Sequence, residues 1–411
     1  MARSGSEEPS HKIATELRAG AGRAPLNLPD FPETTDGTPL AARVLVLDDG
    51  QTRLAFVSLS VIALTRRQVE PIREAVAAVC GTDKVMVACT HVHSGPPVMS
   101  PDESVRREMA KRLAEAAKRA AEAALPLQPA RAGYAADHLP GVSRVRRIIR
   151  RDGTVVTLRR AWPQWWGWAT DPETVGPEEP LDDLLTVVRV ETAEGEPLGA
   201  VMHFTCHPIP DFFGYAARMV EEALPGVPCL VFNGCQGSVD TPFEVPMRGK
   251  TQAEQLPILG DVLGFRTLEL LARAETEGEV RLGFAQRELF LPVDEAFLAE
   301  PGERGRIWPE AVVERGFRTV TQVLRIGDLA FVAAPGEPQV GFAAEVAARS
   351  PFALTRVVGL ANDECAYLLS AESRARGGYE ADPATWGVVT GEGLGRVLEG
   401  MVECLREVGG G

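Results

Sequence analysis

Residues 42–64 read ARVLVLDDGQTRLAFVSLSVIAL, and this stretch decides the kind of fold that the chain can adopt. Two short runs rich in branched apolar residues flank the turn signal Asp48-Asp49-Gly50, which predicts two neighbouring strands. Residues 66–80 follow with apolar residues at helical spacing and predict a helix. Strands that alternate with helices in this way are typical of an α/β protein.

The rest of the chain continues this pattern. Further strand-like runs occupy residues 85–89, 184–191, 199–206, 228–232, 322–333 and 355–369, and helical patterns occupy residues 103–125, 340–348 and 394–408. Neither a repeat nor a low-complexity linker divides the chain. We therefore predict one α/β catalytic domain over residues 1–411, with a central β-sheet flanked by helices, and expect residues 1–20 to be loosely ordered.

Composition limits the partners and the compartment. The 411 residues are 45% hydrophobic, which suits a large buried core, and the formal net charge is −14. This charge disfavours nucleic acid and anionic lipid as partners. The N-terminal residues lack an apolar segment typical of a secretion signal, and no run approaches the ~20 apolar residues of a spanning helix. We expect a cytoplasmic protein without a stable membrane anchor, whose seven cysteines are buried free thiols.

Four of the apolar runs end in polar side chains that are capable of chemistry. Residues 85–89 lead into THVHSGP, residues 201–206 into His207-Pro208, residues 230–232 into NGCQGSVD, and residues 329–333 into the loop that contains Glu337. In α/β sheets, ligands bind beyond the carboxyl ends of the strands, where loops converge. The sequence therefore predicts one site at these strand ends.

The histidines indicate that this site holds a metal. The chain has six histidines, and four of them lie at two of these strand ends: His91, His93, His203 and His207. In an extended backbone, the spacing of His91 and His93 puts both rings on the same side, so both can face one site. A single histidine is more often a satisfied buried or surface side chain, but a set at neighbouring strand ends favours metal binding.

At these residues the sequence resembles the neutral/alkaline, non-lysosomal ceramidases. The run CTHVHSGPP is similar to their THTHSGP motif, and HFTCHP is similar to their second histidine motif. FNGCQGSVDTP is similar to the Gly-Asp-Val-Ser-Pro loop, APGE to Pro-Gly-Glu, and GLANDECAYLLS to the Gly-Leu-x-Asn segment that ends in tyrosine; GGYEAD at residue 377 is also family-like. The matches occur in family order over roughly residues 43–385. The chain stops near the end of the family's catalytic domain, so no C-terminal immunoglobulin-like domain is expected.

The resemblance implies a catalytic zinc ion. It makes His91, His207, Glu337 and Tyr367 the ligands, with His93 contacting substrate or the attacking water. Two imidazoles and a carboxylate leave a catalytic zinc with an open position, in keeping with this assignment. Glu337 could instead act as general base or orient an imidazole, and Tyr367 could instead cap a buried polar network.

The serine loop departs from the family pattern. This chain reads Gly237-Ser238-Val239-Asp240-Thr241-Pro242. Counted from Gly237, the catalytic serine position holds Asp240; counted from the proline, it holds Thr241. We expect Asp240 to act as general base on an attacking water, with Ser238 and Thr241 as alternative nucleophiles, and the amides of residues 234–238 as oxyanion donors.

Residues 133–183 form a basic and aromatic excursion. Tryptophans occupy positions 162, 165, 166 and 168, and we expect Trp165 and Trp166 to line an apolar part of the substrate pocket; a small satellite core is the alternative. Arg144, Arg146 and Arg147 suggest a solvated strand face. The family places an arginine in this part of the chain, so Arg144 is expected to bind substrate, together with Gly237.

These features predict a zinc-dependent hydrolase of a linear amide (N-acyl) bond. Zinc lowers the pKa of a bound water to about 7 and polarises a carbonyl, so a serine nucleophile is not required. The expected substrate is a small molecule with an apolar portion, and not ceramide. An esterase or lactonase would use the same site, and a non-catalytic metal-containing binding protein of the same fold is the alternative from another class.

Overall fold

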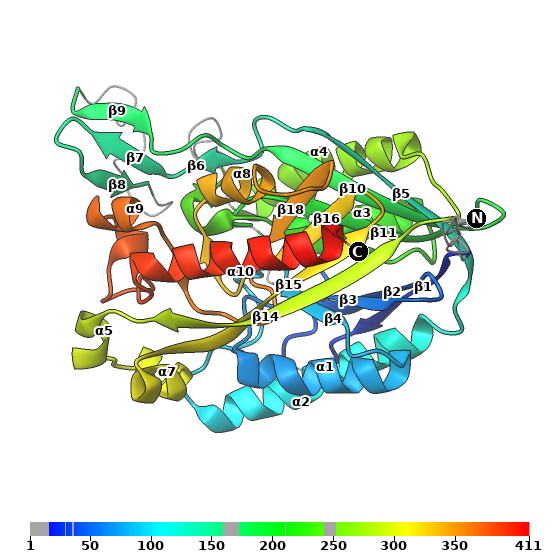
Figure 1. Cartoon of the computed structure of the whole chain (residues 1–411), viewed down its shortest axis with the longest axis horizontal. Coiled ribbons are helices and arrows are strands. Elements are labelled where there is room, and N and C mark those ends of the chain that lie inside the picture. The colour runs from blue at the N-terminus through cyan, green and yellow to red at the C-terminus, as the bar shows by residue number, and fades with distance from the viewer. Residues whose placement is uncertain are drawn as a thin grey trace, which may run out of the picture.

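A computed structural model describes residues 16–28, 30–34, 37–158, 172–209, 211–241 and 252–410. It contains two large β-sheets (Figure 1). The larger sheet has eight strands in the order β12-β11-β10-β5-β1-β2-β3-β4, and the smaller has four in the order β14-β15-β16-β18. The predicted α/β architecture with a large sheet and flanking helices is confirmed. The sequence did not predict that the strands divide between two large sheets.

The larger sheet begins with the predicted pair. Its strands are β1 (Arg18–Pro25), β2 (Ala41–Asp48), β3 (Arg53–Leu59), β4 (Val85–Cys89), β5 (Gln128–His138), β10 (Leu184–Thr192), β11 (Pro197–Phe204) and β12 (Cys229–Asn233). β2 and β3 are antiparallel, whereas β3–β4 and β11–β12 are parallel. In β2 alternate side chains divide between two cores: Val44 and Val46 face one, and Leu45 and Leu47 face the other.

The smaller sheet packs against the inner face of the larger one. Its strands are β14 (Leu282–Pro292), β15 (Gly316–Ile326), β16 (Leu329–Ala333) and β18 (Leu354–Val358). The core between the sheets contains Phe56 of β3, Phe232 of β12 and Phe331 of β16, whose ring centroids lie 5.5 to 6.1 Å apart. This distance is within the usual range for packed aromatic pairs.

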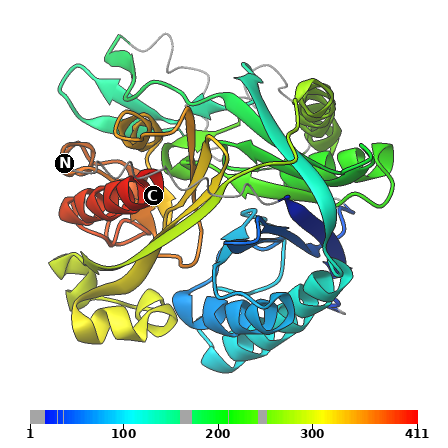
Figure 2. The ribbon, with the colours of Figure 1, turned by 45° about the vertical axis from the view of Figure 1, so that its right-hand side comes forward.

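Helices cover the outer faces of both sheets. α1 (Arg66–Cys80) and α2 (Glu103–Ala123) pack on β1–β4, and α3 (Phe212–Ala223) and α4 (Gln252–Arg273) pack on β10–β12. α8 (Gly341–Ala347) and α10 (Gly391–Gly409) cover the smaller sheet. In Figure 2 the blue and cyan pair α1 and α2 lies outside the blue strands, and the red α10 lies on the yellow and orange strands. The short helices α5 (Glu295–Ala299), α6 (Arg304–Ile307), α7 (Pro309–Glu314) and α9 (Ala371–Ala375) complete the set.

Small pairings of strands form the surroundings of the site. β13 (Val239–Asp240) pairs with β6 (Arg144–Val145), and β17 (Glu337–Pro338) pairs with β19 (Tyr367–Leu368). β7 (Arg147–Arg150) pairs with β8 (Val155–Thr157) and β9 (Thr174–Pro177), while the 3-10 turns η2 (Gln236–Ser238) and η3 (Tyr379–Ala381) lie in the connecting loops. Within the described residues no helix is long and apolar enough to cross a membrane.

The larger sheet curls until its two edges approach each other. Although β12 and β3 lie far apart in the strand order, the Ser58 hydroxyl of β3 donates to the Val231 carbonyl of β12 at 2.8 Å and accepts from the Val231 amide at 3.1 Å. This contact brings the carboxyl ends of β4, β11 and β12 together. The end of β18 joins them, because the Gly359 amide donates to the Asn233 carbonyl and the Cys89 amide to the Leu360 carbonyl.

Candidate metal centre

His91 follows β4 in an unusual backbone conformation. Its φ is +70°, in the left-handed region that a residue other than glycine rarely adopts. Its amide donates to the Val61 carbonyl at 3.0 Å, and its Nδ1 lies 2.8 Å from the Ile62 carbonyl, so the loop after β3 holds both backbone and ring. Such a conformation costs of order 1–3 kcal/mol and is concentrated at functional sites. The rings of His91 and His93 do meet, as predicted, but through this turn and not through extended backbone.

His207 is held in the same manner after β11. Its Nδ1 lies 2.9 Å from the carbonyl of Gln236, which belongs to η2 after β12. A carbonyl can only accept, so Nδ1 of both His91 and His207 carries the proton and each Nε2 presents a lone pair. Burial lowers the pKa of His91 to about 4 and that of His207 to about 3, which makes both rings neutral at pH 7.

Glu337 faces both of these lone pairs. Its Oε2 lies 3.5 Å from His91 Nε2 and 3.1 Å from His207 Nε2. His91 Nε2 and Glu337 Oε2 are buried, and neither has a hydrogen-bond partner within the described parts of the chain. Gly336 allows this placement, because its φ is +140° and a Cβ there would lie 2.6 Å from the Ala366 carbonyl.

These separations suit ligands of one metal ion. Two ligands held about 2.0–2.1 Å from a tetrahedral zinc lie roughly 3.3 Å apart, which matches the separations of Glu337 Oε2 from both imidazoles. His91, His93 and His207 also form a group that could hold a metal, with ligand atoms within 4.8 Å of one another. Lone pairs that face a buried carboxylate oxygen without a hydrogen between them repel, and a cation removes that repulsion.

Tyr367 lies at the edge of this cluster. The parallel pairing of β17 and β19 puts it opposite Glu337, and its ring centroid is 6.4 Å from that of His207. Its hydroxyl accepts a hydrogen bond from Arg146 Nη2 at 3.0 Å. Burial raises the pKa of Tyr367 well above its ordinary value, so the residue is a neutral phenol unless a cation binds beside it.

His93 is exposed, whereas His91 and His207 are buried. Its ring centroid lies 4.6 Å from that of His91 and 5.7 Å from that of His207. The Asp211 carboxylate holds the loop from below, because it accepts from the His93 amide at 2.8 Å and from the Ser94 amide at 3.1 Å. His93 is therefore the solvent-exposed member of the three histidines.

His203 does not join the cluster. Its Nε2 lies 2.7 Å from the Val357 carbonyl, and its Nδ1 lies 3.3 Å from Arg356 Nε. It therefore links β11 to β18 inside the core. Its predicted place among the strand-end histidines is correct by position in the chain, but its side chain points to the face between the sheets.

Residues 237–241 of the loop that departs from the family pattern are buried. The Ser238 hydroxyl accepts from the Val340 amide at 2.8 Å, and the Thr241 hydroxyl donates to the Ile209 carbonyl at 2.9 Å. Both hydroxyls thus support the backbone. Gly237 packs so closely on β17 that a Cβ would lie 2.3 Å from the Glu337 carbonyl. Of the predicted oxyanion donors, the Gly234 and Gln236 amides are already bound to the carbonyls of Phe204 and Gly234.

Asp240 is the acidic side chain in the described part of this loop. It is buried, and its Oδ1 accepts from the Thr241 amide at 2.8 Å. Burial and Arg146 lower the pKa of His207, whereas the carboxylate of Asp240 acts in the opposite direction. Asp240 pairs with Arg144 between β13 and β6, and Arg144 Nε donates to the Thr241 carbonyl at 3.3 Å.

Two predictions about the excursion have different outcomes. Arg146 and Arg147 do not lie on a solvated face: their exposed fractions are 3% and 0%. The prediction was wrong because their partners, Glu178 and Glu380, are distant in sequence and no local pattern reveals them. Trp165 and Trp166 lie outside the described residues.

Comparison with known proteins concerns the fold. No protein-family model matches the chain, and no curated protein matches it. Among solved structures, the neutral ceramidase from Pseudomonas aeruginosa aligns with a TM-score of 0.69 and 18% identity over 95% of this chain and 74% of that chain. A ceramidase complexed with C2 aligns with a TM-score of 0.71 and 18% identity over 95% of this chain and 75% of that chain. The chain therefore has the neutral ceramidase fold.

Proposed function

We propose that this protein is a zinc-dependent hydrolase that cleaves a linear N-acyl amide bond in a small molecule with an apolar portion. The observation that carries the proposal is the position of Glu337 Oε2, which lies 3.5 Å from His91 Nε2 and 3.1 Å from His207 Nε2. Three acceptors in this arrangement fit a divalent cation. The resemblance to ceramidases adds the class of bond, and the shared fold is compatible with it.

His91, His207 and Glu337 would hold the ion, with Tyr367 as a fourth candidate ligand. When bound, zinc polarises the acyl carbonyl and makes water nucleophilic at neutral pH. The Nδ1 hydrogen bonds to Ile62 and Gln236 fix the orientation of both imidazoles before anything binds. The ligand set is therefore organised by backbone carbonyls that belong to the loops after β3 and β12.

The remaining residues would handle protons and the substrate. In this scheme water attacks the acyl carbon, and the Asp240 carboxylate accepts a proton from that water. The carbon–nitrogen bond then breaks, that proton passes from Asp240 to the leaving nitrogen, and an amine and a carboxylic acid are formed; the acid then loses its remaining proton to solvent and leaves as the carboxylate. His93, at the solvent side, would donate to the acyl oxygen or to the leaving nitrogen.

A panel of substrates tests the proposal. N-acyl amino compounds with long and short chains should be hydrolysed, and a chelator should stop turnover until zinc is added. The matching esters and lactones serve as comparison substrates. Turnover that survives complete metal removal would contradict the proposal, as would turnover of the esters alone. Tight zinc binding without hydrolysis of any substrate would instead identify a binding protein.

A further inference from the structure

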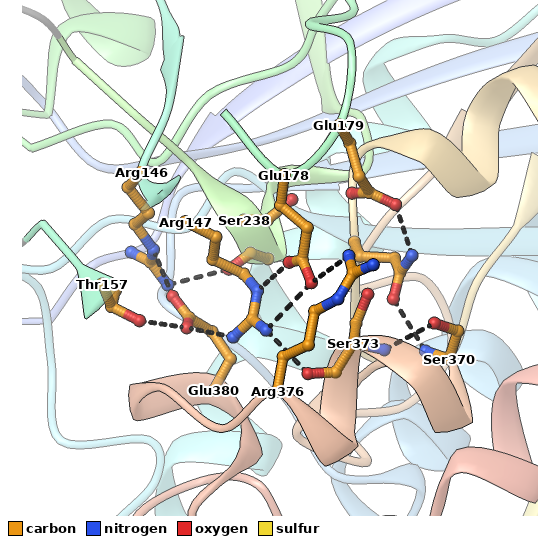
Figure 3. A network of polar contacts seen from close by, with 12 residues as sticks. Arg146, Arg147, Thr157, Glu178, Glu179, Ser238, Ser370, Ser373, Arg376 and Glu380 are labelled. Carbon is orange, nitrogen blue, oxygen red and sulfur yellow. Dashed lines mark hydrogen bonds and ion pairs between the residues drawn. The ribbon is translucent and has the colours of Figure 1, made fainter. Parts of the chain in front are cut away.

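A second cluster of buried charges adjoins the candidate metal centre. It consists of Arg146, Arg147, Glu178 and Glu380 (Figure 3). The side chains of Arg147 and Glu380 are both 0% exposed. Full burial of two opposite charges is costly unless each is paired and hydrogen-bonded, so the cluster needs a structural or functional reason.

Glu380 joins the two arginines. Its Oε1 accepts from Arg146 Nε at 2.7 Å, and its Oε2 accepts from Arg147 Nη1 at 2.9 Å and from the Thr157 hydroxyl at 2.7 Å. Burial alone would raise the pKa of Glu380, but the guanidinium groups of Arg146 and Arg147 outweigh it and lower that pKa. Glu380 is therefore an ionised anchor for both arginines.

Arg146 extends this anchor to the metal centre. Its Nη2 donates to the Tyr367 hydroxyl at 3.0 Å and to the Gly237 carbonyl at 2.8 Å. Tyr367 lies opposite Glu337, and Gly237 packs on the Glu337 backbone. Arg146 Nη2 thus contacts both Tyr367 and Gly237. Glu380 sets the orientation of the Arg146 guanidinium through its hydrogen bond to Nε.

The other acidic residue of the cluster lacks this connection. Glu178 accepts from Arg147 Nε at 2.5 Å and from Arg376 Nη1 at 3.3 Å. Arg147 Nη2 also donates to the Ser373 carbonyl at 2.8 Å. Glu178 therefore ties β9 to β7 and α9, and it has no hydrogen bond to Arg146 or Tyr367 within the described chain.

We infer that Glu380 is a positioning residue for the metal centre, acting through Arg146 on Tyr367 and Gly237. The inference rests on the proposed function, since it requires that the centre binds zinc. Groups that orient metal ligands typically change metal affinity about 10–100-fold when they are replaced. Glu380 has this role although it contacts neither the imidazoles nor Glu337 by hydrogen bond.

The test compares Glu380→Gln with Glu178→Gln. Both changes remove one buried carboxylate charge and keep its shape, but only the first acts on Arg146. Zinc dissociation constants are measured by competition with a chelator, and thermal unfolding of the metal-free proteins reports structural damage. We expect Glu380→Gln to weaken zinc binding about 10–100-fold and Glu178→Gln to leave it within about threefold, at comparable losses of stability.

A double-mutant cycle with Tyr367→Phe separates positioning from general damage. If Glu380 acts through the Tyr367 hydroxyl, Glu380→Gln should weaken zinc binding much less in the Tyr367→Phe background than in the wild type. Thr157→Val, which removes one support of Glu380 and keeps all charges, should weaken zinc binding several-fold even if Glu380→Gln fails to fold.

The outcomes distinguish the inference from the proposed function. Wild-type protein that binds no zinc would overturn the proposed function and the inference with it. Wild-type protein that binds zinc, with equal effects of Glu380→Gln and Glu178→Gln or an unchanged affinity in Thr157→Val, would overturn the inference alone.

Discussion

Two buried polar clusters lie side by side in this protein. The polar groups of one have hydrogen-bond partners within the protein, whereas two polar atoms of the other have none among the described residues. In the arginine–glutamate cluster, Glu380 accepts from Arg146, Arg147 and Thr157, so its negative charge is both paired and hydrogen-bonded. In the histidine cluster, His91 Nε2 and Glu337 Oε2 have no hydrogen-bond partner in the described chain, although Nδ1 of His91 and Nδ1 of His207 are each held by a backbone carbonyl. Buried groups are normally satisfied by the protein itself. Other buried polar atoms of the described residues also have no hydrogen-bond partner, but His91 Nε2 and Glu337 Oε2 face each other at 3.5 Å, and this arrangement fits a cation between them.

The largest effect should come from removing an imidazole of the unsatisfied cluster. We expect His207→Ala to lose its zinc and all measurable turnover, while the metal-free variant unfolds at a temperature close to that of the metal-free wild type. The reason is that His207 would bind the metal ion from the loop after β11 and is not part of the hydrophobic core. Elemental analysis, turnover and thermal unfolding check this.

His203→Gln provides the matched control. It changes a buried histidine of β11, four residues before His207, that binds the Val357 carbonyl, and it should keep zinc and turnover. A His207→Ala protein that retains zinc and activity would show that the histidine cluster is not the site.

Asp240 should have the next largest effect. Asp240→Asn keeps the shape of the side chain but cannot accept a proton, so we expect kcat to fall by about 10²- to 10⁴-fold with zinc still bound. Ser238→Ala and Thr241→Ala should change kcat little, since both hydroxyls serve the backbone. Inactive Ser238→Ala with bound zinc, together with an active Asp240→Asn, would assign the attack to a hydroxyl.

A change in the arginine–glutamate cluster should lower the free energy of unfolding. Arg147→Met removes one partner of Glu380 and Glu178 and leaves their charges buried, which typically costs roughly 3–5 kcal/mol of unfolding free energy. Chemical denaturation measures this cost. A loss below about 1 kcal/mol, the range of an exposed ion pair, would mean that the cluster is not a structural support.

The smallest effect concerns pH. His91 and His207 have pKa values of about 4 and about 3 in the folded protein, below their ordinary value of 6.5. Between pH 6.5 and 4 these histidines bind protons in the unfolded chain but not in the folded chain. Their contribution to the free energy of unfolding is therefore fully present above pH 6.5 and is lost as the pH decreases.

Metal-free wild type should therefore lose up to about 1.4 kcal/mol per pH unit for each of these histidines, and metal-free His207→Ala should lose less. Denaturant unfolding at pH 7 and pH 5 compares the two proteins. Equal pH dependence would show that His207 is not buried in its neutral form.

The sequence predicted the elements and the residue types of the site better than it predicted their surroundings. The helix at residues 66–80 and the strand at residues 85–89 match α1 and β4, because their periodicity and turn signals are local. The candidate site residues could be predicted to lie together because strand ends are recognisable in sequence. The curl of the larger sheet brings together residues that are distant in sequence, such as Ser58 and Val231, and no local pattern contains such a contact.

The arginine–glutamate cluster illustrates the same limit. Arg147 and Glu380 are more than 200 residues apart and read separately as surface charges. Arg146 and Arg147 are adjacent in sequence and Glu380 lies in the family-like GGYEAD run at residue 377, but no local pattern connects these two segments. Pairing across such a separation is decided by tertiary structure alone.

X-ray diffraction at the zinc absorption edge, from crystals grown with zinc, tests the central claim most directly. The account predicts an anomalous peak about 2.0–2.1 Å from Nε2 of His91, Nε2 of His207 and a carboxylate oxygen of Glu337. A zinc ion bound elsewhere, with these three side chains arranged around no metal, would contradict it.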